Sequence, residues 1–186
     1  MKLRTLGCAV LLALVVVTPE FAQQSVPPRQ PDVVFVPTPN DVVNAMLKLA
    51  NVSTTDVVYD LGSGDGRIVI TAAKMYGARG VGIDIDPERT REATANAAKS
   101  GVADKVTFRT EDLFLADISP ATVVTLYLSG PVNARLAPKL MKELKPGTRV
   151  VSHAFDLGSW KPQQRTSVSQ RPLFLWVVAA PSDTRR

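Results

Sequence analysis

A short glycine-rich run constrains the fold of this chain more than any other feature. It follows an apolar stretch, Val57 to Leu61, which has the composition of a buried strand and contains the acidic residue Asp60. A helical pattern then runs from Arg67 to Tyr76. A strand, a glycine-rich turn and a helix N-terminus in this order bring bare backbone against a nucleotide-like ligand. The glycines of the turn stand at alternate positions: Gly62, Gly64 and Gly66.

The spacing of these glycines separates the run from a related motif. The dinucleotide fingerprint is G-x-G-x-x-G, and its last glycine allows close packing of helix on strand. Here Arg67 stands at that position. The run therefore argues against a nicotinamide-dependent oxidoreductase.

Acidic residues also follow the next two predicted strands. The second strand is expected over 80–85, and Asp84 near its end lies about 24 residues after Asp60, close to the spacing at which a carboxylate meets ribose hydroxyls. The third strand is expected over 105–110 and leads to Asp112. Because parallel strands end at one edge of a sheet, we expect the three carboxylates to surround one ligand. For each of them singly, a turn or helix-capping role stays open.

Regular alternation of strands and helices predicts an α/β domain over 32–181. The 186 residues suit one domain, and a hydrophobic content of 45% is enough for a core. Asp86 has the position of a helix N-cap, and so has Thr38, with Pro39 in the first turn. Pro138 is expected to interrupt its helix. Further elements are expected as helices over 65–76, 87–100 and 131–144, strands over 56–61, 122–128 and 148–155, and a hairpin over 164–169 and 173–179.

The N-terminal residues have the pattern of a secretory signal peptide over 1–22. Basic residues precede an apolar run from Leu6 to Val17, which is short for a membrane span, and Ala22 is a plausible last residue before cleavage. A proline-rich linker is expected over 23–31. The signal predicts a secreted or periplasmic protein with no stable membrane insertion; an uncleaved membrane anchor is the alternative.

Composition excludes several kinds of site. The only cysteine, Cys8, lies in the expected signal peptide, and the chain has one histidine, so we expect no metal site and no thiol chemistry. The formal net charge is +5, but the lysines are dispersed and no arginine cluster alternates with aromatics. Nucleic acid is therefore disfavoured as a partner. We expect a monomer.

The glycine run and the acidic strand ends resemble the class I methyltransferases. The resemblance implies a Rossmann-like, doubly wound, mostly parallel seven-stranded sheet, with strand order 3-2-1-4-5-7-6 and a C-terminal antiparallel hairpin. It also implies S-adenosyl-L-methionine as the cofactor, with the acidic residue after the third strand bonded to the adenine amino group. The cofactor-binding residues it implies are Pro37, Thr38, Asp60, Gly62, Ser63, Gly64, Gly66, Asp84, Asp112 and Leu113.

A narrower resemblance covers about Val34 to Pro162. The Pro37-Thr38-Pro39 segment, Leu126-Tyr127-Leu128 at the fourth strand and Ser152-His153 at the fifth are similar to those of small protein-lysine methyltransferases of archaea and their mitochondrial relatives. An Asn/Asp-Pro-Pro-aromatic run, typical of enzymes that methylate base amines, is absent from the fourth strand. The resemblance implies a protein lysine as the acceptor. A small-molecule methyltransferase and an exported, non-catalytic cofactor-binding protein are the alternatives.

Two residues are candidates for the transfer step. Tyr127 would lie beside the transferred methyl group and orient an amine, or it is an ordinary core aromatic. His153 falls at the C-terminal end of the fifth strand, where a histidine can act as general base or simply satisfy local hydrogen bonds. A sulfonium methyl is already activated, so alignment of an uncharged amine is the main requirement and no metal is needed.

Overall fold

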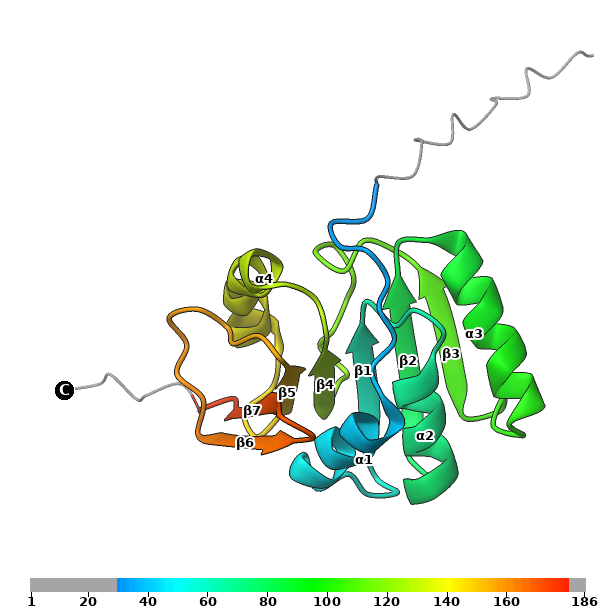
Figure 1. Ribbon diagram of the computed structural model, residues 1–186, viewed down its shortest axis with the longest axis horizontal. Coiled ribbons are helices and arrows are strands. Elements are labelled where there is room, and N and C mark those ends of the chain that lie inside the picture. Colours follow the sequence, from blue (N-terminus) through cyan, green and yellow to red (C-terminus); the bar gives the residue numbers. More distant parts are fainter. Residues whose placement is uncertain (1–29, 181–186) are drawn as a thin grey trace, which may run out of the picture.

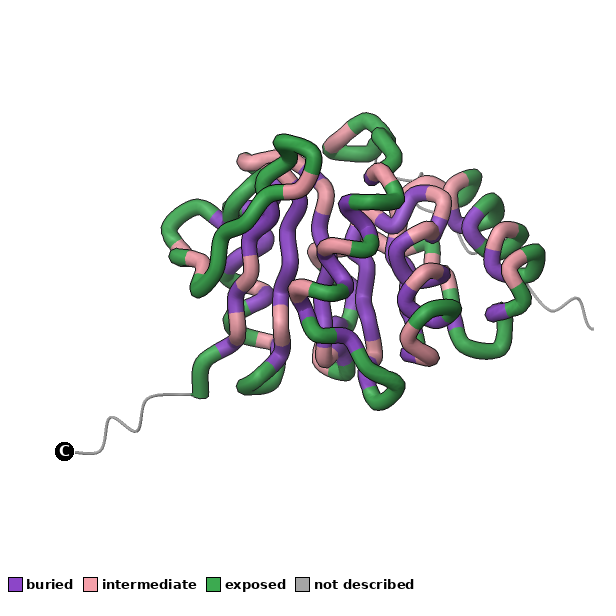
Figure 2. The backbone as a smooth tube through the Cα atoms, turned by 60° about the horizontal axis from the view of Figure 1, so that its bottom comes forward, coloured by how far each residue is buried: buried purple, intermediate pink, exposed green. Residues whose placement is uncertain are grey.

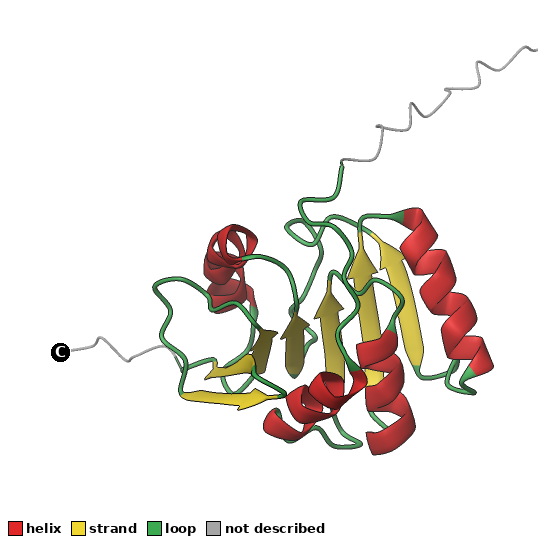
Figure 3. Ribbon diagram, viewed as in Figure 1, coloured by secondary structure: helices red, strands yellow, loops and turns green. Residues whose placement is uncertain are grey.

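The computed structural model describes residues 30–180, so the predicted signal peptide over 1–22 lies outside the described residues. One seven-stranded sheet with helices packed on both faces makes up the domain (Figures 1 and 3). The strands are β1 (Val57–Leu61), β2 (Arg79–Asp84), β3 (Val106–Thr110), β4 (Val123–Leu126), β5 (Arg149–His153), β6 (Gln164–Val168) and β7 (Arg171–Val177). The helices are α1 (Asn40–Leu49), α2 (Arg67–Tyr76), α3 (Pro87–Lys99) and α4 (Gly130–Glu143).

The sheet has the predicted order, β3-β2-β1-β4-β5-β7-β6. Strands β1 to β5 pair in parallel, whereas β7 pairs antiparallel with both β5 and β6. The predicted α/β fold with a C-terminal hairpin is therefore confirmed. In such a sheet the C-terminal ends of the parallel strands share one edge. The direction in which successive strands are added reverses between β1 and β4, and ligands bind at the C-terminal edge beside this point.

Alternate side chains along each central strand enter two separate cores. Val58 joins the core beneath α1 and α2, while its neighbour Tyr59 joins the core beneath α4. In Figure 2 the central strands are almost continuously buried and the helices are exposed on their outer sides. Burial on both faces explains why these strands read as apolar runs in the sequence. No helix within residues 30–180 is long and apolar enough to cross a membrane.

Three local predictions were wrong. The first helix begins one residue late: Pro39 is its N-cap, and the Thr38 side chain makes no capping bond. Pro138 lies inside α4 without ending it. Pro138 and Ala134 both lie on the exposed side of α4, where a carbonyl oxygen that loses its helical partner can accept a hydrogen bond from water. The hairpin turns at Ser169 and Gln170, both with positive φ, so β7 begins earlier than predicted.

Candidate active site

A cavity of about 410 Å³ lies at the C-terminal edge of the sheet. Its floor comes from the residues that end β1, β2 and β4 and from the turn after β3. Residues 30–38, called the strap below, cover it and then lead into α1. Figure 1 shows the strap in blue, passing the arrowheads of β1 and β2. The predicted site residues on the lining are Pro37, Thr38, Asp60, Gly62, Ser63, Asp84, Asp112, Leu113 and Tyr127.

Asp60 is the most deeply buried carboxyl group of the cavity, at 2% exposed. Its Oδ1 accepts a hydrogen bond of 2.7 Å from the Thr125 hydroxyl on β4. Burial, with smaller contributions from the charges of Asp84 and Asp65, raises the pKa of Asp60 to about 7, and the Thr125 bond opposes this shift. A cation placed in the cavity would therefore favour the ionised form of Asp60.

Asp84 ties the glycine-rich turn to the end of β2. Its Oδ2 accepts a bond of 2.8 Å from the Gly64 amide, and its Oδ1 accepts one of 3.0 Å from the Asp86 amide. The amides of Gly62 and Ser63 both donate to the Ile83 carbonyl oxygen, at 2.8 and 3.0 Å. These amides thus hold the turn rigid. A carboxylate has about four acceptor positions, so Asp84 retains capacity for ligand hydroxyls.

Gly64 and Gly66 do not lie on the cavity lining. A Cβ at Gly64 would lie 2.1 Å from Cε2 of Phe35 in the strap. A Cβ at Gly66 would lie 2.5 Å from the Phe108 ring and 2.9 Å from Ala93. Gly64 therefore makes room for the strap, and Gly66 allows α3 and β3 to approach the turn. Both glycines therefore affect the cavity indirectly, through the segments that pack against the turn.

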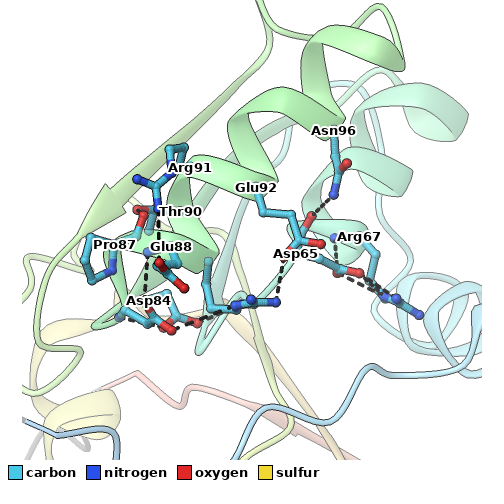
Figure 4. A network of polar contacts seen from close by, with 12 residues as sticks. Asp65, Arg67, Asp84, Pro87, Glu88, Thr90, Arg91, Glu92 and Asn96 are labelled. Carbon is cyan, nitrogen blue, oxygen red and sulfur yellow. Dashed lines mark hydrogen bonds and ion pairs between the residues drawn. The ribbon is translucent and has the colours of Figure 1, made fainter.

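The turn is fixed to its surroundings by a small polar network, shown in part in Figure 4. Arg67 pairs with Asp65, with an Nη2–Oδ2 distance of 2.5 Å, and its Nη1 donates to the Thr38 carbonyl oxygen at 2.9 Å. Asn96 on α3 donates from Nδ2 to the Asp65 carbonyl oxygen at 3.0 Å. The Arg67 side chain thus links the glycine turn to the strap. This role of Arg67 was not evident from the sequence.

Two further arginines hold the strap across the cavity. The Arg89 guanidinium lies 5.1 Å from the centre of the Phe35 ring, within cation–π range. Arg135 on α4 lies 3.5 Å from Oδ1 of Asp32 and stacks over the Phe114 ring at 4.2 Å. The strap is therefore attached to α3 at one point and to α4 at another.

Tyr127, which follows β4, and His153, which ends β5, lie side by side. Their ring centroids are 3.9 Å apart, with 32° between the ring planes. Tyr127 is on the lining, whereas His153 is 2% exposed and lies behind it. Burial and, to a smaller extent, the Arg171 charge lower the pKa of His153, against an opposing effect of Asp41. This geometry makes His153 a poor general base for a group in the cavity.

Several lining residues were missed in the sequence. Asp86 caps α3 as predicted, since its Oδ1 accepts a bond of 2.8 Å from the Glu88 amide, yet it also lines the cavity. Helical spacing around Arg89 gave no indication that it faces a site. Within the strap, only Pro37 and Thr38 were predicted to bind the cofactor, and the residues before them read as a linker and an extended segment. The missed residues of the lining that carry charge are Asp32, Asp65, Asp86, Arg67 and Arg89.

Comparison with known proteins decides the family. Residues 60–164 match the ANTKMT methyltransferase domain. The chain belongs to this methyltransferase family. A protein-lysine N-methyltransferase of Saccharolobus islandicus is 50% identical over 153 residues, which cover 80% of this chain and 95% of that protein. The predicted membership of the class I, S-adenosylmethionine-dependent methyltransferases is confirmed.

Two other relatives of this methyltransferase differ in their described substrates. The adenine nucleotide translocase lysine N-methyltransferase of Mus musculus is 35% identical over 103 residues, and the match covers 55% of this chain and 45% of that protein. A crystal structure of an RNA methyltransferase from Salinibacter ruber, in complex with S-adenosyl-L-homocysteine, has 56% identity and a TM-score of 0.77. That match covers 80% of this chain and 98% of the other.

The cavity of this methyltransferase fits S-adenosylmethionine in its charges. Among the described residues, six aspartates and two arginines line it, so it favours a cation such as a sulfonium with an ammonium group. Asp60 and Asp84 are two of these six carboxylates. The buried Ser63 Oγ has no hydrogen-bond partner among residues 30–180. Within residues 30–180 no cluster of three or more metal-binding side chains was found.

Proposed function

We propose that this chain transfers methyl groups from S-adenosylmethionine to lysine side chains of proteins. The observation that carries the proposal is the excess of carboxylates around the cavity. Six aspartates against two arginines, among the described residues, attract a lysine ammonium group and repel a phosphate backbone. The names of two relatives, a protein-lysine N-methyltransferase and an adenine nucleotide translocase lysine N-methyltransferase, agree with this choice.

Exposed apolar side chains near the cavity favour a protein acceptor over a small molecule. In the strap, Val34 is 88% exposed and Val36 is 56% exposed, although both line the cavity. Leu115, in the turn after β3, is 81% exposed. Apolar side chains that surround a polar site are typical of surfaces that contact another protein. We infer that the acceptor protein covers the strap and this turn.

The chain's own residues must align an uncharged amine and exclude water. When bound, S-adenosylmethionine supplies a methyl group on a positively charged sulfur. Asp60 and Asp84 would hold the cofactor, and the strap would shield it from solvent. The half-buried Tyr127, on the cavity lining, would contact the acceptor, where its ring would narrow the cavity and its hydroxyl would orient the amine.

Loss of the lysine proton needs no protein base in this proposal. A lysine has a reference pKa of about 10.4, so it enters mostly protonated at neutral pH. His153 is buried behind Tyr127 and its pKa is lowered, so the proton is released to water before the amine enters. Activity is therefore expected to rise with pH through the alkaline range.

The test is transfer of labelled methyl groups to lysine-rich proteins, with lysine methylation read by mass spectrometry. Tyr127→Phe should lower turnover and leave cofactor affinity unchanged, because the hydroxyl acts mainly in the transition state. Tight cofactor binding without methylation of any protein would reject the lysine proposal. A small-molecule acceptor or a non-catalytic binding protein would then be favoured.

RNA is the second candidate acceptor, because the 56% identical Salinibacter ruber protein is described as an RNA methyltransferase. Two observations stand against it: the acidic cavity, and Leu126-Tyr127-Leu128-Ser129 at the end of β4 in place of an Asn/Asp-Pro-Pro-aromatic run. Total RNA added in parallel with protein substrates separates the two. Label in RNA alone would favour this second candidate.

We also propose that the chain is exported and cleaved near Ala22, and that the mature domain is a monomer. The apolar run from Leu6 to Val17 after a basic start supports export. Intact mass should show a secreted or periplasmic species beginning near Gln23, and light scattering should give the mass of one chain. Full-length protein in the membrane fraction would favour an anchor instead.

A further inference from the structure

The chain makes a strained turn directly after β5. The Phe155 amide donates a hydrogen bond of 2.8 Å to the His153 carbonyl oxygen, which closes a turn of three residues. Its central residue, Ala154, has φ of 67°. Turns of this kind are rare, and a residue with a Cβ seldom adopts a positive φ. Such a conformation persists only where its surroundings hold it, and it is found most often at functional sites.

Asn133 on α4 is the side chain that holds the turn. It is fully buried, and its Nδ2 lies 3.2 Å from the Phe155 carbonyl oxygen, 3.1 Å from that of Asp156 and 3.1 Å from the Ser152 Oγ. The Ser152 hydroxyl donates to the same Phe155 oxygen at 2.6 Å. With Nδ2 replaced by an apolar group, the carbonyl oxygens of Phe155, in the turn, and of Asp156, directly after it, would lose a buried donor.

The strained turn carries His153, whose ring contacts the wall of the active site. His153 is 2% exposed, and its Nδ1 has no hydrogen-bond partner among the described residues. Its ring centroid lies 3.9 Å from that of Tyr127, which lines the cavity. With no hydrogen bond at Nδ1, packing holds the ring, and the backbone of the turn and the contact with Tyr127 are part of that packing.

We propose that Asn133 is a positioning residue for methyl transfer: it holds the turn over 153–155, which keeps the His153 ring packed against Tyr127 at the acceptor end of the cavity. The inference rests on the proposed function, since Tyr127 is taken to contact the acceptor amine. In this arrangement His153 contributes the shape of a flat ring. Asn133 itself lies outside the cavity lining and acts through the turn.

The experiment compares Asn133→Ala with the double variant Asn133→Ala/Ala154→Gly. Without the Asn133 amide, Ala154 should relax to a negative φ and move the His153 ring away from Tyr127. Misplacement of about 1 Å is enough to lower kcat by roughly tenfold to a hundredfold. Cofactor affinity should stay within about twofold, because the cofactor-binding carboxylates are untouched. Glycine adopts a positive φ readily, so the double variant should recover much of kcat.

Thr148→Ala is the matched control. Thr148 is 4% exposed and its hydroxyl donates to the Ala121 carbonyl oxygen at 3.3 Å, just before the opposite end of β5. The variant also removes a buried polar group, but far from the turn. It should leave kcat at the wild-type value. A loss equal to that of Asn133→Ala would show that general destabilisation explains both, and would overturn the proposal.

The single histidine of the chain gives a readout that needs no acceptor. In tag-free protein, the His153 ring protons should show a ring-current shift from Tyr127 in nuclear magnetic resonance spectra. Asn133→Ala should move these shifts toward those of a free histidine. Its pKa should also rise toward the ordinary value as the ring leaves its buried position, where Arg171 on β7 and Asp41 on α1 face it. Unchanged shifts and unchanged pKa would overturn the proposal.

Variants of His153 test the ring itself should Asn133→Ala not fold. His153→Leu should lower kcat, and His153→Phe, which restores a flat ring without a titrating group, should recover most of it. Loss of kcat in both would point to proton transfer and overturn the proposal. If the wild type methylates no lysine, the proposed function fails, and the His153 resonances of the Asn133 variants alone decide whether the turn positions the ring.

Discussion

Three aspartates at one sheet edge have three different environments, and the differences decide what each can do. Asp60 is buried beneath the cavity, and its carboxylate accepts a hydrogen bond from the Thr125 hydroxyl. Asp84 accepts two backbone amides and is half-buried. Asp112 accepts the Phe114 amide at 2.9 Å. Burial moves the pKa of Asp60 into the neutral range.

Asp84→Ala should weaken S-adenosylmethionine binding by roughly 2 kcal/mol or more, which is about thirtyfold in Kd, because hydrogen bonds to a charged group are lost. The cofactor affinity of Asp84→Asn should lie between those of the wild type and Asp84→Ala, because the asparagine amide oxygen still accepts a hydrogen bond from the Gly64 amide. Calorimetry measures both, with Asp104→Ala, at an exposed position away from the cavity, as the control. Equal affinities in all three variants would reject the ribose assignment.

Asp60 should make cofactor affinity depend on pH. Below about pH 7 the free protein holds Asp60 protonated, and a cationic cofactor must displace that proton. Affinity should therefore rise between about pH 5.5 and 7.5, below the range in which the cofactor's own α-amino group titrates. Calorimetry in buffers of different ionisation enthalpy should detect proton release. Asp60→Asn should release no proton on binding. If cofactor affinity still depends on pH in this variant, another group is responsible for the dependence.

At the scale of elements, the site is an assembly of the glycine turn and the strap. The ring of Phe35 occupies the space that a side chain at position 64 would need. Arg67 bonds the turn to the strap, and the Arg89 guanidinium lies within cation–π range of the Phe35 ring. The glycine at position 64 therefore does more than fit a ligand-binding pattern. It leaves space for Phe35, which lies 29 residues earlier in the chain.

Gly64→Val should abolish cofactor binding by displacing the strap. Gly64 has φ of +52° and a Cβ there would lie 2.1 Å from the Phe35 ring. Gly101→Val is the matched control, because Gly101 has φ of +71° but nothing within 4 Å of the added Cβ. Both variants bear backbone strain, and only the first displaces the strap. Calorimetry should find near wild-type affinity in Gly101→Val; loss in both would mean that strain alone is responsible.

The sequence predicted the elements well because their patterns are local. Strands buried on both faces read as apolar runs, and Asp86 before Pro87 marked the start of α3 correctly. Pro138 misled because its effect depends on which face of α4 it occupies. Asn133 and Arg89 gave no indication of their roles. Their partners, the turn over 153–155 and the strap, lie far away in the chain, and only the tertiary fold brings them together.

At the scale of the whole molecule, two cores support one charged edge. The apolar layers beneath α1 and α2 and beneath α4 close off the sheet, so the polar groups gather where the parallel strands end. This gathering was predictable from topology, since parallel strands end at one edge. The cover provided by the strap was not, because an extended segment without periodicity carries no information about what it packs on.

A buried carboxyl group at this edge lowers the stability of the folded protein as pH rises. The folded pKa of Asp60 is about 7, against an ordinary value of 3.8. Between these values the folded chain keeps a proton that the unfolded chain has lost, so the free energy of unfolding falls with rising pH. Above about pH 7 both states are ionised and the penalty stays constant.

Asp60→Asn removes this penalty, because an amide does not ionise and its oxygen can still accept the Thr125 hydroxyl. The variant should be more stable than the wild type above about pH 7, by up to roughly 4 kcal/mol, and the gain should shrink as pH falls toward about 4. Urea unfolding of the cofactor-free protein across this range measures the difference. Asp104→Asn, at an exposed position, should show no such trend. A stability gain for Asp60→Asn that is the same at every pH would mean that Asp60 titrates normally in the folded protein. The gain would then have a cause other than the ionisation of Asp60.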